Sequence, residues 1–423
     1  MQEDFLHYLW KYKIRKAQNL KTTSGETVAL LHVGQHNTDS GPDFFNAQIK
    51  IGEQLWAGNV EVHIKSSDWY VHGHEQDKAY DNVILHVVWE HDTEIFRKNN
   101  SEIPTLQLKD TVDTGLLNTF SKLYSKGNKW IYCEDDLSKT DGFVLNNWLE
   151  RLYIERLEQK YQTIYKLLLN SKNDWEAVLF KMLAKNFGLK VNGEAFFSLA
   201  QSVDYAVVRK LQSNQFGLEA LFFGQCGWLD SELEDVHYLK LQKEYAFLKQ
   251  KFQLSNTSVV QPQFFRLRPP NFPTIRLSQL ASLYSNEKQL FSKLMELNSL
   301  EDYYKVFDCE TSLYWETHYS FGKSSKPSKK RLTKTFVDLL LINTIIPIKF
   351  AHCKANGKEI DNVVQLAQQI HAERNSLLSA FANLGIKCQN ALQSQALIQL
   401  KRNYCERQKC LDCSIGANIL QLV

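Results

Sequence analysis

The sequence predicts an α+β protein, with a mixed α/β domain at residues 1–140 and a mainly α-helical domain at residues 141–423. Three observations lead to this prediction. In several short segments before residue 110, apolar residues alternate with a period of two, which is typical of strands. After residue 141 they recur with the 3.6-residue period of amphipathic helices. A chain of 423 residues, 43% hydrophobic and 23% charged, is also long enough for two well-packed domains.

The first domain is expected to begin with an amphipathic helix at residues 4–18 and to continue as strands. The predicted strands are residues 27–33, 44–51, 59–66, 80–89 and 104–109. A turn at Gly52 and Glu53 joins the second strand to the segment that leads into the third. Residues 66–81 are polar and are expected to form a loop, and residues 110–141 are ambiguous.

The second domain is expected to consist of helices. A long amphipathic helix covers residues 144–168, and the next begins at a sequence that resembles a capping box, residues 173–176, and ends at Gly188. Further helical patterns cover residues 194–212, 215–226 and 231–251. Residues 336–351 are the most apolar, but polar residues and a proline interrupt them, so we expect a buried helix rather than a membrane span.

Charge and composition restrict the class of protein. A formal net charge of +3 and a pI near 8.2 are compatible with a nucleic-acid partner but do not require one. No signal peptide is visible, and the eight cysteines are interpreted as reduced thiols of a cytoplasmic protein with no membrane partner. The sequence contains no P-loop, dinucleotide-binding glycine run, G-x-S-x-G or H-E-x-x-H motif, which argues against the commonest NTPases, dehydrogenases and hydrolases. It does not indicate an oligomeric state.

A candidate site lies on the predicted strand at residues 59–66. One face of this strand is apolar, and the other carries Glu61, His63 and Lys65. Asp43 follows a Gly-Pro turn, and an antiparallel neighbouring strand can bring it beside Glu61. Two carboxylates that lie close together repel unless a cation joins them, so we predict that Asp43 and Glu61 bind a divalent metal. An ordinary solvated strand face is the alternative interpretation.

The Pro-Asp pair at residues 42–43 and the later Glu61 resemble the motif of the PD-(D/E)XK nuclease superfamily. The resemblance implies a restriction-endonuclease-like first domain, Mg or Mn as cofactor and phosphodiester hydrolysis. This sequence has His63 where the superfamily has lysine, and either His63 or Lys65, which lies on the same face, can replace it. The alternative is a catalytically inactive, nuclease-like protein that binds nucleic acid or a protein partner.

The chain as a whole resembles a bacterial family catalogued as domain of unknown function 2851. The resemblance covers nearly the whole length and is carried by residues 41–44, 60–63, 80–88 and 268–273 and by the terminal cysteines. This family implies no particular activity.

Histidines are concentrated in the first domain, where eight of the twelve lie within the first 91 residues. Neutral imidazole binds Zn, Fe or Mn, so a transition-metal hydrolase built on this segment is a third option. We expect His63 near the site. We expect His72 and His74 to lie in a loop away from it, and His86 to be a hydrogen-bonded core residue.

The C-terminus contains a cysteine motif that is typical of metal sites. Cys405, Cys410 and Cys413 are spaced like ligands of zinc or of an iron–sulfur cluster. Among the candidates for a fourth ligand, Cys388 is the nearest in sequence, and Cys353 or a histidine is the alternative. Some nucleases of the superfamily named above hold a cluster through C-terminal cysteines, so the resemblance also implies such a site. Redox-active or purely structural thiols remain the alternative.

Overall fold

The structure is a computed structural model, and it describes residues 3–13, 19–37, 39–112, 114–124 and 129–421. The chain divides into two compact units. Unit 1 contains residues 1–148 and 401–423, and unit 2 contains residues 149–400. Unit 1 has a mixed sheet and unit 2 is mainly helical, which confirms the predicted α+β class. The cysteine-containing C-terminus belongs to unit 1, whereas the sequence analysis assigned it to the helical domain.

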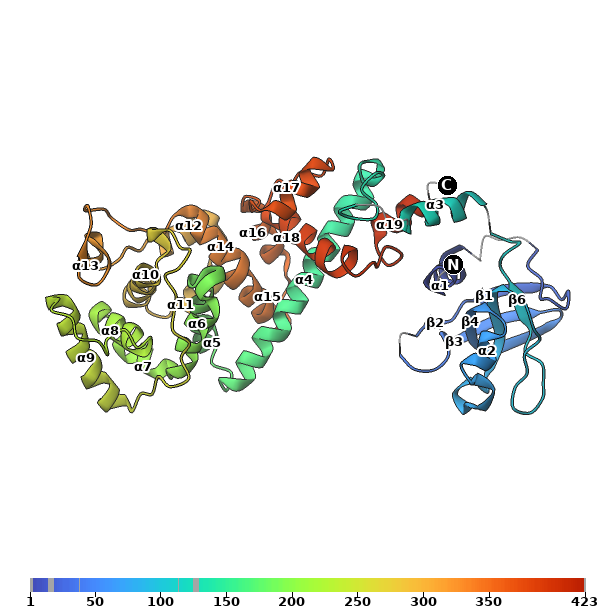
Figure 1. The fold of residues 1–423 in the computed structure, drawn as a ribbon, viewed down its shortest axis with the longest axis horizontal. Helices are drawn as coiled ribbons and strands as arrows, with labels where there is room; N and C mark the ends of the chain where they lie inside the picture. The colour runs from blue at the N-terminus through green and yellow to red at the C-terminus, as the bar shows by residue number, and fades with distance from the viewer. Residues whose placement is uncertain (1–2, 14–18, 38, 113, 125–128, 422–423) are drawn as a thin grey trace. The chain divides into compact units, whose positions relative to one another are not determined.

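Unit 1 is built on a six-stranded mixed sheet (Figure 1). Its strand order is β1-β3-β4-β5-β6, and β2 pairs with β3. Strand β3 is antiparallel to β1 and β4, and β5 is parallel to β4 and β6. The strands are β1 (Val28–His32), β2 (Gln35–His36), β3 (Phe44–Ile51), β4 (Gln54–Lys65), β5 (Val83–Glu90) and β6 (Thr105–Gln107).

Helix α1 (Glu3–Tyr8) and the π-helical turn Leu9–Lys13 pack against the apolar face of β4. Val60 and Val62 of β4 share a buried core with Phe5 and Leu6 of α1. The predicted alternation of β4 therefore holds on this face, because its apolar side chains are removed from water by the helix. The remainder of the predicted opening helix, residues 14–18, lies outside the described residues.

The polar segment after β4 forms a compact cover rather than an open loop. It contains helix α2 (Asp68–Val71) and the 3₁₀ turns His74–Gln76 and Lys78–Tyr80. Trp69, 1% exposed, packs in a small apolar cluster with Val83 of β5. As a result, the Glu61 and His63 face of β4 is buried and is not an ordinary solvated strand face.

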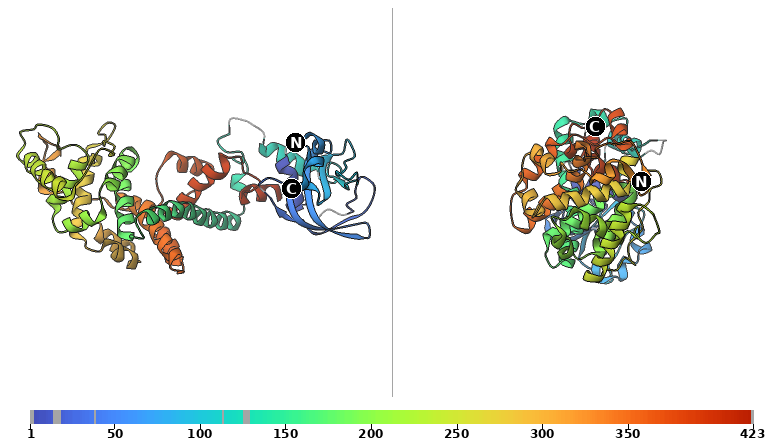
Figure 2. Two further views of the ribbon diagram at one scale, coloured as in Figure 1. Left: turned by 90° about the horizontal axis from the view of Figure 1, so that it is seen from below. Right: turned by 90° about the vertical axis from the view of Figure 1, so that its left-hand side faces the viewer.

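Unit 2 consists almost entirely of helices, which run from blue-green through yellow to red in Figures 1 and 2. The first of them, α4 (Gly142–Asn170), starts in unit 1, and its long amphipathic pattern was predicted. The others are α5 (Trp175–Phe187), α6 (Leu189–Ser202), α7 (Tyr205–Leu211), α8 (Gln215–Gln225), α9 (Val236–Phe252), α10 (Pro273–Asn286), α11 (Leu290–Glu296), α12 (Leu300–Val306), α13 (Leu313–Glu316), α14 (Lys334–Leu340), α15 (Ile346–Ala355), α16 (Asp361–Gln369), α17 (Ser376–Asn383) and α18 (Ala391–Leu400).

The most apolar helical run is Lys334–Ala355, which joins α14, a π-helical turn and α15. Its length and composition would allow it to cross a membrane, but 72% of its most apolar window is buried inside the protein. This burial agrees with the predicted core helix and is compatible with a soluble protein.

The C-terminal segment packs within unit 1. It contains a π-helical turn, Lys401–Cys405, and helix α19 (Ser414–Gln421). Helix α19 lies beside α3 (Thr114–Tyr124) (Figure 1). Leu420 of α19 shares the buried core of the sheet and α1, which explains why this segment belongs to unit 1.

Candidate metal centre

Asp43 and Glu61 lie side by side on neighbouring strands. Phe44 pairs with Val60 in the antiparallel register of β3 and β4, so the preceding Asp43 is opposite Glu61. The backbone N–H of Asp43 donates to Oε2 of Glu61 at 3.1 Å, and the N–H of Val62 donates to Oδ2 of Asp43 at 3.0 Å. These reciprocal hydrogen bonds fix both carboxylates at the same end of the strand pair.

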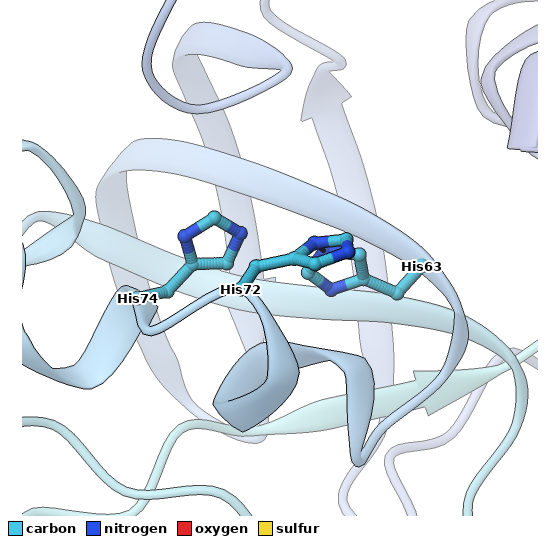
Figure 3. Close-up of side chains that lie close together, drawn as sticks. All are labelled: His63, His72 and His74. Carbon is cyan, nitrogen blue, oxygen red and sulfur yellow. Dashed lines mark hydrogen bonds between the residues drawn. The ribbon is translucent and has the colours of Figure 1, made fainter.

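Three histidines lie close together (Figure 3), and two of them, His63 and His74, contact Glu61. His63 comes from β4, His72 ends α2 and His74 begins the next 3₁₀ turn. One ligand atom from each of the three lies within 4.8 Å of the others. Gly73, with a φ of +71°, turns the chain between His72 and His74. The expectation that His72 and His74 lie away from the site is therefore wrong, because α2 and Gly73 fold this segment back over β4.

The distances tie this histidine cluster, defined as His63, His72 and His74, to the Glu61 carboxylate. Nε2 of His74 is 3.3 Å and Nε2 of His63 is 3.6 Å from Oε1 of Glu61. Nε2 of His63 is also 3.1 Å from Nδ1 of His72. Glu61 and His63 are buried, His74 is half-buried and His72 is exposed. Imidazole nitrogens and a carboxylate oxygen this close together form the type of donor set that binds Zn, Mn or Fe.

His86 supports His63 from the neighbouring strand. Glu61 and His86 are register partners in the parallel β4–β5 pair, and Nε2 of His86 is 2.8 Å from Nδ1 of His63. Burial lowers the pKa of His63 to about 3 and holds the pKa of His86 well below its ordinary value. His63 is therefore neutral and cannot replace the positive charge of a lysine, but it offers a lone pair to a metal.

Helix α1 contributes two further residues that the sequence analysis did not identify. Nε2 of His7 is 3.2 Å from Oδ2 of Asp43. Burial raises the pKa of Glu3, and the Asp43 carboxylate raises it further; Glu3 lines the same pocket as His7. The sequence feature that could have identified Glu3 and His7 is their spacing of four residues, because it places both side chains on one face of the opening helix.

The electrostatics of Glu61 are compatible with a bound cation. Burial raises the pKa of Glu61, and the nearby Asp43 carboxylate adds to this effect, although His74 opposes it. Nε2 of His7 and Nε2 of His74 are buried and make no hydrogen bond, although each lies near a carboxylate oxygen. A cation between these nitrogens and oxygens would give the unpaired nitrogens a partner and would neutralise the carboxylate charge. The residues therefore fit a bound metal.

The other predicted ligands lie elsewhere. Lys65 is exposed, its backbone N–H donates to Asp68, and its charge acts on Asp92. The structure therefore does not bring Lys65 beside Asp43 and Glu61. Cys405, Cys410 and Cys413 belong to unit 1, whereas Cys388 lies in unit 2 on the wall of a pocket between α14 and the α17–α18 connection.

A pocket of about 760 Å³ opens beside His7 in unit 1. Glu3, His7 and His36 are on its wall. Its other charged lining residues are of both signs: Asp4, Lys11, Arg407, Lys409 and Asp412. His7, which contacts Asp43, is therefore open to this pocket, whereas Asp43, Glu61 and the histidine cluster are not on its wall.

Comparison with known proteins identifies the family. The family model described as protein of unknown function DUF2851 matches residues 3–376. No curated protein and no solved structure matches the chain. Because the family match includes both Asp43 and the histidine cluster and extends over most of the sequence, the chain belongs to the DUF2851 family of proteins of unknown function.

Proposed function

We propose that this protein is a metal-dependent hydrolase that cleaves phosphodiester bonds, that is, a nuclease. The observation that carries the proposal is the histidine cluster with its ligand atoms within 4.8 Å of one another, next to the buried Glu61 carboxylate. Imidazole ligands favour Mn or Zn over Mg, which prefers oxygen ligands and retains water. Of the two metals implied by the nuclease resemblance, Mn therefore suits these donors better.

The proposed ligands are Glu61 and the histidine cluster, with Asp43 completing the set from β3. A bound divalent ion supplies Lewis-acid polarisation of the phosphate and lowers the pKa of a bound water. Neighbouring groups of the protein hold the proposed metal ligands in position. The reciprocal backbone hydrogen bonds hold the two carboxylates, and the His86 contact fixes the orientation of His63. His7 lies against Asp43 and restricts the rotation of its carboxylate.

The choice of a phosphodiester substrate has two supports. The first is the resemblance of the Pro-Asp pair and Glu61 to the PD-(D/E)XK motif. The second is the pocket beside His7, where Lys11, Arg407 and Lys409 can hold phosphate oxygens.

All eight cysteines are free thiols, which supports a reducing, cytoplasmic location.

A second candidate is a nuclease-like binding protein without catalytic activity. The position of Lys65 favours it, because this lysine is exposed near Asp92, away from the carboxylate pair. His63, which is neutral, does not replace its charge. On this alternative the metal site stabilises the fold, and the pocket binds nucleic acid without cleaving it.

The test is a cleavage assay with the purified full chain. Single- and double-stranded DNA and RNA are incubated with the metal-free protein and with added Mg, Mn or Zn. We expect cleavage with Mn that Asp43→Asn and His74→Ala abolish. The matched controls Asp39→Asn and His32→Ala alter exposed residues of the same unit and should retain activity. Binding of metal and nucleic acid without cleavage would favour the second candidate, and no metal binding would contradict both.

A further inference from the structure

Four cysteines lie on two segments of unit 1 that contact each other, residues 129–148 and the C-terminal segment. Cys410 and Cys413 are 8% and 6% exposed, and Cys133 and Cys405 are half-buried. All four are free thiols. Cys133 lies in the part of the sequence that showed no clear period, and the sequence analysis did not consider it as a ligand.

Aromatic contacts connect Cys133 to Cys410. The ring of Tyr132, the residue before Cys133, lies 5.7 Å from the ring of Tyr124. The Tyr124 hydroxyl donates to the carbonyl oxygen of Gln408, two residues before Cys410, at 3.5 Å. Cys133 and Leu411 also pack against the same apolar core that contains Cys410. These contacts bring the backbone at residue 133 to the loop that carries Cys410.

A second set of contacts holds the C-terminal segment around Cys405 against residues 129–148. The ring of Trp148 lies 5.2 Å from the ring of Tyr404, the residue before Cys405. Lys401 lies 5.1 Å above the ring of Trp130, so the beginning of the C-terminal segment is also held against the Cys133 region.

The backbone around Cys410 and Cys413 suits bound thiolates. Cys413 directly precedes α19, and the N-terminal end of a helix favours a negatively charged thiolate. The N–H of Cys413 donates to the carbonyl oxygen of Cys410 at 3.3 Å, which closes a tight turn. A Cβ atom at Gly416 would lie 2.1 Å from that oxygen, so only glycine allows this approach.

Cys388 is separate from these four cysteines. Cys133, Cys405, Cys410 and Cys413 all belong to unit 1, whereas Cys388 belongs to unit 2, where it lies on the wall of a pocket.

We propose that Cys133, Cys405, Cys410 and Cys413 together bind zinc or an iron–sulfur cluster through four thiolates. Cys133 supplies the ligand that the C-terminal motif lacks, in place of Cys388. Metal binding releases the four thiol protons and links two parts of unit 1 that are distant in sequence. The proposal does not depend on the histidine cluster or on nuclease activity.

Elemental analysis and X-ray absorption on the full chain, purified anaerobically, test this proposal. Absorption spectroscopy identifies the ligands, because Zn–S bonds of about 2.3 Å differ from Zn–N bonds of 2.0–2.1 Å. We expect a metal with four sulfur ligands, either zinc or iron with inorganic sulfide, and the analysis of iron and sulfide distinguishes the two. This measurement on the unaltered protein also separates the site from any metal bound by histidines.

Variants then assign the fourth ligand. Cys133→Ser should lose the sulfur-bound metal at least tenfold, as Cys410→Ser should, whereas the matched control Cys388→Ser should retain it. Absence of any sulfur-ligated metal in the unaltered chain would overturn the proposal. Full retention of metal by Cys133→Ser, or its loss from Cys388→Ser, would overturn the assignment of Cys133. If Cys133→Ser fails to fold, the number of cysteine sulfurs bound to the metal in the unaltered chain decides the assignment. Four bound sulfurs, unchanged in Cys388→Ser, support Cys133 as the fourth ligand. Three bound sulfurs contradict it.

Discussion

Replacing Glu219 with glutamine should stabilise unit 2 above pH 7 and change its stability little near pH 4.5. Glu219 lies on α8, is fully buried and accepts hydrogen bonds from Ser278 and Ser312. Burial raises the pKa of Glu219 to about 7, and the serine hydrogen bonds oppose this only in part. Because the folded state binds the proton more tightly than the unfolded state, the stabilisation is complete below pH 4.5 and is lost as the pH rises to about 7.

The size of the effect follows from the difference between the two pKa values. A rise from the ordinary value of 4.5 to about 7 corresponds to about 3 kcal/mol in the free energy of unfolding, at about 1.36 kcal/mol for each pKa unit. Glutamine keeps the shape of the protonated carboxyl group and cannot ionise. For a unit of this size, the variant should melt roughly 6–12 °C higher than the unaltered protein above pH 7.

Thermal unfolding of the full chain, followed by calorimetry between pH 4.5 and pH 8, measures this difference. The matched control is Glu234→Gln, which alters an exposed glutamate of the same unit and should show the pH dependence of the unaltered protein. The reasoning would be refuted if Glu219→Gln melted at the same temperature as the unaltered protein at pH 8, or if it were destabilised there.

Three further predictions concern unit 1. Removing bound metal with EDTA should lower the melting temperature of unit 1, because metal at 100 times its Kd stabilises the fold by about 2.7 kcal/mol; unchanged melting would count against a bound metal. His86→Leu leaves the buried Nδ1 of His63 without its partner and should weaken metal binding about 10- to 100-fold, measured by competition with a chelating dye; unchanged affinity would exclude a positioning role. Gly416→Ala should destabilise unit 1 by about 1–3 kcal/mol in denaturant unfolding, because its Cβ would overlap the carbonyl oxygen of Cys410; Gly142→Ala, which has open space, should not.

The strands and the pairing of the two acids were predictable because local rules determine them. The period of two in β4 identifies a strand, and the Gly-Pro turn before Asp43 sets where β3 begins. Antiparallel pairing then brings Asp43 beside Glu61, as the structure shows. The long helix α4 was equally clear, because its apolar positions repeat over its length.

The histidine cluster and the fourth cysteine were not predictable from local pattern. His72 and His74 lie in a short polar segment whose fold depends on the burial of Trp69 and on the positive φ of Gly73. Both are tertiary effects that leave no period in the sequence. Cys133 is brought to Cys410 by contacts between segments far apart in the chain, whereas the sequence search for a ligand favoured Cys388 because it is near in sequence.

A crystal structure of the full chain soaked with Mn tests the central claim most directly. Anomalous scattering locates the ion without assumptions about its ligands. The account predicts a peak at the Glu61 and Asp43 carboxylates and the imidazole nitrogens of the histidine cluster, and its loss in His74→Ala but not in His32→Ala. A map with no peak at the histidine cluster, or with Glu61 and His74 hydrogen-bonded directly to each other under saturating Mn, would contradict it.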